Sequence, residues 1–148
     1  MSSVYEPPDG PPSGVPGGKT NIGLESNVAA MLCYIGNFVC CLGIVLSIVF
    51  LITEKENRFV KFHAMQSLFV AIAVIVVGII VGLLGLVMSL VLGMANLGFL
   101  EWFLVLGLRL ILLLIFAVFF LIAGIKAYGG QWYKLPIVGN FAWDAVNK

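Results

Sequence analysis

Two polar side chains at the start of an apolar run are the first candidates for chemistry in this sequence. His63 and Gln66 lie one helical turn apart and therefore share a helix face. A histidine exchanges protons near neutral pH, and a glutamine amide both donates and accepts hydrogen bonds. The pair fits either a structural contact that fixes one helix against another or a polar access point for a substrate or proton. We favour the structural contact.

The segment after the last apolar run is rich in aromatic and basic side chains. A lysine at a helix C-terminus interacts favourably with the helix dipole, tyrosine rings are typical of the headgroup region, and proline ends a helix. These properties favour a membrane-surface anchor over a ligand pocket. We also predict that the segment folds back beside His63 and Gln66. The candidate residues in it are Lys126, Tyr128, Tyr133, Lys134 and Pro136.

One charge, Arg109, interrupts the last apolar run. A helix from Arg109 to Lys126 is about 26 Å long, nearly a full crossing of a hydrocarbon core of about 30 Å. Arg109 is therefore either an anchor at the far membrane surface, which we favour, or a buried charge paired with Glu101. Asn37 is the strongly polar side chain of the first apolar run, and we expect it to bond to another helix or to face a wet pocket.

The sequence lacks the residue sets that most catalytic sites need. His63 is its single histidine, the three cysteines at 33, 40 and 41 lie in one apolar run, and no glycine-rich loop ends in the lysine and hydroxyl residues that cradle phosphate. We therefore expect neither enzymatic activity nor a bound cofactor or metal. The net charge of +1 gives no electrostatic basis for nucleic-acid binding.

The composition indicates a membrane protein. Of the 148 residues, 61% are hydrophobic and 10% are charged, whereas soluble domains have roughly 45–50% apolar and 25% charged residues. The apolar runs predict an all-α integral membrane protein with three transmembrane helices, at about 27–53, 62–93 and 102–126. The uncharged run 64–100 is too long for one simple crossing. It forms either one long tilted helix or a hairpin, and four transmembrane helices remain an alternative.

We place the helical membrane domain at 26–148. Two terminal segments of the chain differ from its apolar helices. The tail 1–25 is rich in proline and glycine and cannot bury enough apolar surface to fold, so we expect it to be disordered. Residues 128–148 should lie along the membrane surface as an interfacial segment.

The positive charges predict an orientation. With three crossings, the loop 54–61 and the C-terminus share one side, and most lysines and arginines lie there. The positive-inside rule then puts that side in the cytoplasm and the N-terminus outside. We expect the membrane to be that of a prokaryotic cell.

Three blocks of the sequence, residues 23–34, 54–67 and 126–139, resemble a known family. It is the family of small membrane proteins grouped with the chloroplast inner-envelope import component of about twenty kilodaltons. The resemblance implies a polytopic helical membrane protein, usually drawn with four helices. Its plant members are taken to act in protein import, and it brings no known activity for prokaryotic members. Two features depart from the pattern: Asn140 stands where an aspartate is expected, and the segment 83–100 is longer.

Two functions follow as hypotheses. The first is a membrane scaffold or assembly component, linked to protein translocation, whose partners are the lipid bilayer and either a second copy of the chain or another membrane protein. The alternative is an oligomeric small transporter or channel that uses intramembrane polar groups such as Asn37 and Arg109. Three helices alone enclose little pore, so this alternative requires oligomerisation.

Overall fold

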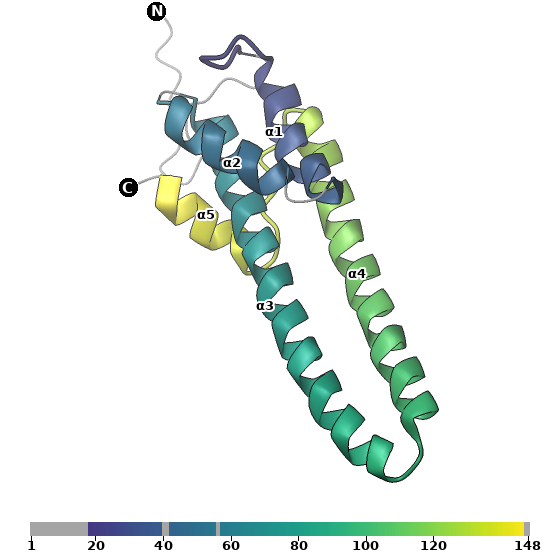
Figure 1. Cartoon of the computed structure of the whole chain (residues 1–148). Coiled ribbons are helices and arrows are strands. Elements are labelled where there is room, and N and C mark those ends of the chain that lie inside the picture. Colours follow the sequence, from purple (N-terminus) through teal and green to yellow (C-terminus); the bar gives the residue numbers. More distant parts are fainter. Residues whose placement is uncertain (1–17, 40–41, 56, 147–148) are drawn as a thin grey trace, which may run out of the picture.

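The computed structural model describes residues 18–39, 42–55 and 57–146, and over these ranges the fold is helical (Figure 1). An isolated bridge between Lys19 and Glu25 is the extended pairing in these ranges. The predicted all-α class is thus seen in the part of the chain that the structure describes. The elements are α1 (Ser26–Ile35), the 3₁₀ turn η1 (Gly36–Phe38), α2 (Leu42–Thr53), α3 (Arg58–Met94), α4 (Gly98–Tyr128) and α5 (Val138–Val146).

The helices α3 and α4 form a long antiparallel pair. Each is long and apolar enough to cross a membrane, and only 22% and 6% of their most apolar windows are buried inside the protein. At about 1.5 Å per residue they measure about 55 and 46 Å. Helices that expose this much apolar surface are solvated by lipid rather than by water.

The chain reverses between α3 and α4 in a short turn. Asn96 takes a left-handed backbone conformation, with φ at 57°, and the Leu97 amide donates to the Leu92 carbonyl at 2.8 Å. These features form a Schellman motif, which caps the C-terminus of α3. The long uncharged run therefore continues as one helix to Met94 and only then folds back.

The single helix predicted at 27–53 is not observed. The chain breaks at η1, and α1 and α2 fold into a helical hairpin whose two ends meet. The Asn21 backbone amide donates to Glu54 Oε1 at 2.7 Å, and the Asn21 side-chain amide donates to the Thr53 carbonyl at 2.6 Å. Asn57 Nδ2 likewise donates to Ser26 Oγ at 2.5 Å. The first apolar run thus enters and leaves at the same end of the molecule.

Two glycines explain the break. A Cβ atom on Gly36 would lie 2.8 Å from the Gly43 backbone nitrogen, and a Cβ on Gly43 would overlap Asn37. The start of α2 can approach the end of α1 this closely only because both positions lack side chains. Composition alone does not reveal this reversal, since no charge or proline marks it.

Several predicted boundaries also shift. The helix expected at 62–93 begins at Arg58, because the Asn57 side chain accepts from the Val60 amide at 3.2 Å and caps it. The helix expected at 102–126 spans 98–128. Residues 18–25, placed in the disordered tail, form a turn in which the Ser26 amide donates to the Gly18 carbonyl at 2.7 Å. Residues 1–17 lie outside the described residues.

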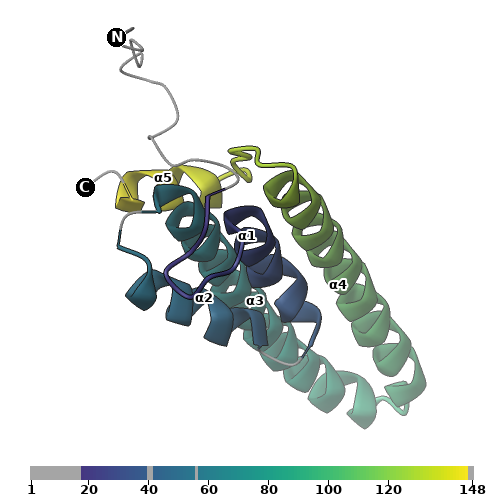
Figure 2. The same cartoon turned by 90° about the horizontal axis from the view of Figure 1, so that it is seen from above.

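The buried core lies at one end of the molecule. α1 packs against α3 and α4, α2 packs against α3, and α5 lies along α3 near its start (Figures 1 and 2). The largest core side chains include Tyr34, Phe50 and Phe59, all fully buried. Towards the turn at Asn96, only α3 and α4 remain. We call the crowded end, where α3 begins and α4 ends, the wide end, and the other the narrow end.

Candidate functional site

Tyr34, on α1, lies at the centre of a buried polar network at the wide end. Its hydroxyl is 3.0 Å from His63 Nδ1, and His63 Nε2 is 3.1 Å from the Gln131 carbonyl oxygen. A carbonyl only accepts, so Nε2 carries the proton and donates to Gln131. In the neutral ring Nδ1 then accepts, and the Tyr34 hydroxyl donates to it. Tyr34 and His63 are both completely buried.

Gln66 completes the network and holds the C-terminal segment. Its Nε2 donates to the Tyr34 hydroxyl at 2.8 Å and to the Tyr133 carbonyl at 3.1 Å. Its Oε1 accepts from the Leu135 amide at 3.1 Å. Both hydrogens and the oxygen of the Gln66 side-chain amide therefore take part in hydrogen bonds. The predicted fold-back of the C-terminal segment beside His63 and Gln66 is confirmed.

Aromatic side chains cover the network from the C-terminal side. The Phe59 ring meets the His63 ring edge-on, with centroids 4.6 Å apart, and Trp132 packs against Phe59 at 5.2 Å. The Lys134 ammonium lies 3.7 Å from the centroid of the Trp143 ring, a cation–π contact between the segment and α5. Within this arrangement the His63 side chain is completely buried.

A second polar cluster ties α1 to α3 at the hairpin turn. Ser67 Oγ donates to the Cys33 carbonyl at 2.6 Å, and Asn37 Nδ2 donates to Ser67 Oγ at 2.9 Å and to the Cys33 carbonyl at 2.7 Å. The expectation that Asn37 bonds to another helix is confirmed. Because Ser67 directly follows Gln66 on α3, the network and this cluster hold α1 against α3 at two neighbouring levels.

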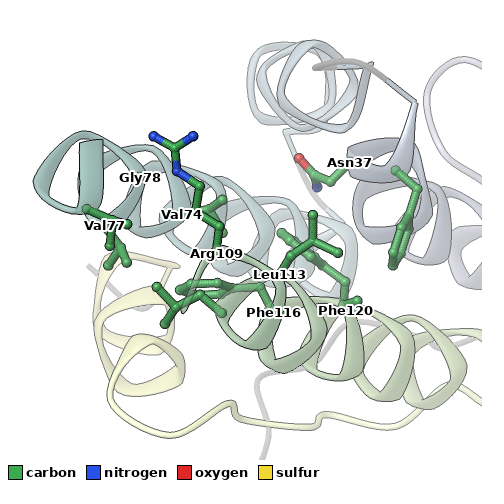
Figure 3. A pocket seen from close by; sticks show the side chains of 12 residues that line it. Asn37, Val74, Val77, Gly78, Arg109, Leu113, Phe116 and Phe120 are labelled. Carbon is green, nitrogen blue, oxygen red and sulfur yellow. The ribbon is translucent and has the colours of Figure 1, made fainter. Parts of the chain in front are cut away.

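Arg109 lies away from both clusters. It lines a pocket of about 420 Å³ between α3, α4 and the hairpin turn, together with Asn37 and apolar side chains (Figure 3). The described residues show no ion pair between Arg109 and Glu101, although both line a smaller neighbouring recess. The alternative of a buried Arg109–Glu101 pair is therefore not seen, and Arg109 is exposed.

The structure divides the predicted candidates into three groups. His63 and Gln66 form the network, while Tyr133 contributes its backbone carbonyl and Lys134 its ring contact. Pro136 lies in the turn before α5, where its carbonyl accepts from the Val138 amide at 2.8 Å. Lys126 and Tyr128 lie at the end of α4, and the Tyr128 ring is exposed. Arg109 belongs to the pocket.

Sequence reasoning missed Tyr34, the residue that joins His63 to Gln66. The available signal was a phenol within an apolar run, one helical turn before Asn37. A hydroxyl there needs a buried partner, which a residue on a neighbouring helix must supply. Among the described residues, no group of three or more histidine, cysteine, aspartate or glutamate side chains could hold a metal ion.

We call the hydrogen-bonded network of Tyr34, His63 and Gln66 the latch, because it holds three elements together. Three elements distant in sequence meet in it, and each polar side-chain atom of Tyr34, His63 and Gln66 has a protein partner. A buried network that is fully satisfied rigidifies the elements that it joins. The structural interpretation of His63 and Gln66 thus agrees with the geometry better than a proton or substrate path.

Comparisons with known proteins give consistent results. Residues 25–142 match the family described as the magnetosome magnetite crystal formation protein family. The chain is 34% identical over 128 residues to a UPF0132 membrane protein of Methanocaldococcus jannaschii, covering 84% of this chain and 92% of the relative. It is also 34% identical over 124 residues to a UPF0132 membrane protein of Archaeoglobus fulgidus, covering 83% and 97%. No solved structure matches.

Proposed function

The chain belongs to the magnetosome magnetite crystal formation protein family and is a small membrane protein, and we propose that it acts as a scaffold that shapes the membrane it spans. The observation that carries the proposal is the unequal packing of the two ends. Five helices gather at the wide end, and two helices reach the narrow end, within the described residues. A protein of this shape occupies the two leaflets unequally.

The depth of the hairpin supports this proposal. The charged side chains Arg58, Lys61 and Lys126 lie at the wide end and mark one membrane surface. From there α1 extends over ten residues, or about 15 Å, which is half of a hydrocarbon core of about 30 Å. The α1–α2 hairpin therefore ends near the bilayer midplane, while α3 and α4 continue through the second leaflet.

Helix α5 adds area at the surface of the same leaflet. Its buried face carries Gly139 and Ala142, whereas Phe141, and Ile137 directly before the helix, have exposed side chains. An amphipathic helix of this kind inserts its apolar side at the headgroup boundary. Added area in one leaflet favours a membrane that is convex on that side. The latch joins α1 and α3 to the segment between α4 and α5, so these parts of the wide end act as one rigid unit.

The charges at the wide end support an orientation. By the positive-inside rule the wide end faces the cytoplasm. Because α1 and α2 form a re-entrant hairpin, residues 18–25 lie on the same side as the C-terminal segment, unlike in the three-crossing expectation, which put the N-terminal side outside. The cations that support this orientation are Lys19, Lys55, Arg58, Lys61, Lys126 and Lys134.

The experiment measures sorting between flat and curved membrane. In a cysteine-free background, the variants Asn140→Cys and Asn96→Cys are reconstituted into giant vesicles and labelled from outside with an impermeant dye. Each dye then reports only molecules with the wide end or the narrow end outward, because both positions are exposed. On a thin tether drawn from the vesicle, the first population should be enriched and the second depleted. Equal densities of both populations on the tether would contradict the proposal.

The transporter hypothesis keeps one supporting observation, the pocket that holds Asn37 and Arg109. A transporter predicts flux of ions or solutes across liposome membranes, which the proposed scaffold does not require. A translocation-linked scaffold, as the plant import resemblance suggests, predicts a co-purifying membrane protein. Flux above background that is lost in Arg109→Gln would favour the transporter over the scaffold.

A further inference from the structure

We infer that the pocket between Asn37 and Arg109 binds an anionic phospholipid of the leaflet at the narrow end, with the Arg109 guanidinium on its phosphate. The α1–α2 hairpin stops above this pocket, and α3 and α4 form its walls (Figure 3). The lipid fills the space that the hairpin leaves in that leaflet. The inference concerns a ligand and does not depend on the proposed shaping function.

The depth of Arg109 fits a phosphate. Lys126 lies in the last turn of α4 at the wide end, and Arg109 lies about 26 Å from it along the helix. A hydrocarbon core of about 30 Å then puts the guanidinium within reach of the opposite headgroup layer. Arg109 thus lies where a lipid phosphate ends and an acyl chain begins.

The walls of the pocket fit an acyl chain. From Arg109 to Phe120 the pocket follows α4 for about 16 Å. Its lining consists of apolar side chains apart from Asn37 and Arg109, and its volume is about 420 Å³. Ligand pockets commonly measure about 300–1,000 Å³. A free phosphate ion would leave this apolar space empty, so the shape favours a phospholipid over an inorganic anion.

The charge of Arg109 is available for such a ligand. No ion pair involves Arg109 among the described residues. Glu101 lies two helical turns away, about 12 Å along α4, and it lines the neighbouring recess but not this pocket. A guanidinium binds phosphate oxygens in a bidentate manner. An unpaired arginine at the edge of the hydrocarbon core is costly, and an anionic headgroup removes that cost.

Figure 3 shows the arrangement that the inference uses. The Arg109 guanidinium and the Asn37 amide lie apart from each other, and Leu113, Phe116 and Phe120 line the pocket from α4. Val74 and Gly78 form the α3 side of the pocket. The headgroup therefore binds at one end, and the acyl chain extends towards the hairpin turn.

Native mass spectrometry of the purified full chain tests the inference. Dioleoyl phosphatidylglycerol and dioleoyl phosphatidylcholine are titrated separately, and the apparent Kd is measured for each. The wild type should bind phosphatidylglycerol at least about tenfold more tightly, because the choline cation of phosphatidylcholine offsets the charge of the same phosphate and is repelled by Arg109. Arg109→Gln should remove this preference. Lys126→Gln, which removes a cation of the same helix outside the pocket, should keep it.

A second pair of variants tests the acyl site without changing charge. Ala117 lines the pocket, whereas the adjacent Val118 is exposed and does not. Ala117→Trp should weaken phosphatidylglycerol binding severalfold, and Val118→Trp should leave it unchanged. The inference would be overturned if Arg109→Gln kept the preference for phosphatidylglycerol or if Lys126→Gln lost it equally. Equal effects of the two tryptophan variants would overturn it as well.

Discussion

Of the three latch residues, Tyr34 is the one that bonds to both of the others. Its hydroxyl accepts from Gln66 and donates to His63, so it joins two donor–acceptor chains that would otherwise be separate. His63 and Gln66 were accessible from the sequence because they mark the start of an apolar run. Tyr34 was not, because its importance comes from a contact with a helix distant in sequence.

Removing the Tyr34 hydroxyl tests this role. Tyr34→Phe leaves His63 Nδ1 and one Gln66 hydrogen without a partner in a fully buried site. Unsatisfied buried groups cost about 1–3 kcal/mol each, so the Tm in detergent should fall. Tyr128→Phe removes an exposed hydroxyl and should leave the Tm unchanged. Equal Tm values for the two variants would show that the hydroxyl contributes nothing.

Gln66 provides an independent test at the same scale. Gln66→Leu keeps the volume but leaves the Leu135 amide and the Tyr34 hydroxyl without their partner. We expect a loss of about 2–4 kcal/mol and earlier proteolysis of residues 129–146. Gln131→Leu is the matched control, since its side chain is exposed and only its carbonyl is used. If both variants are proteolysed alike, Gln66 does not hold the C-terminal segment.

Hydropathy predicted some elements and not others, for a physical reason. It identified α3 and α4 because long uncharged runs must be helical in lipid, where every backbone polar group needs an internal partner. It did not predict the α1–α2 hairpin, because Gly36 and Gly43 act through close backbone approach rather than through polarity. The interfacial segment was expected, but its helix, α5, depends on packing against α3.

The hairpin turn gives a prediction at the scale of elements. Gly36→Ala puts a Cβ 2.8 Å from the Gly43 nitrogen, so α1 and α2 must move apart. The resulting strain should lower the Tm in detergent and weaken the Asn37–Ser67 bond. Gly107→Ala is the control, because nothing lies within 4 Å of the added Cβ, and alanine favours a helix by about 1 kcal/mol. A stable Gly36→Ala variant would argue against the close approach of α1 and α2.

At the scale of the whole molecule, the two ends of the α3–α4 pair have different surroundings. The wide end combines the latch, the aromatic cover and the cations, while the narrow end consists of α3 and α4 alone and exposes apolar side chains. The proposed membrane shaping and the inferred lipid site both follow from this inequality. Both depend on one property, that the first apolar run does not cross the bilayer.

The most direct test is therefore the sidedness of three single-cysteine variants in a cysteine-free background. Lys19→Cys, Asn96→Cys and Lys134→Cys place exposed thiols before α1, at the α3–α4 turn and before α5. In sealed vesicles of uniform orientation, an impermeant reagent should label positions 19 and 134 from one side and position 96 only from the other. Labelling of positions 19 and 134 from opposite sides would mean that the first run crosses the membrane, and would contradict the re-entrant hairpin.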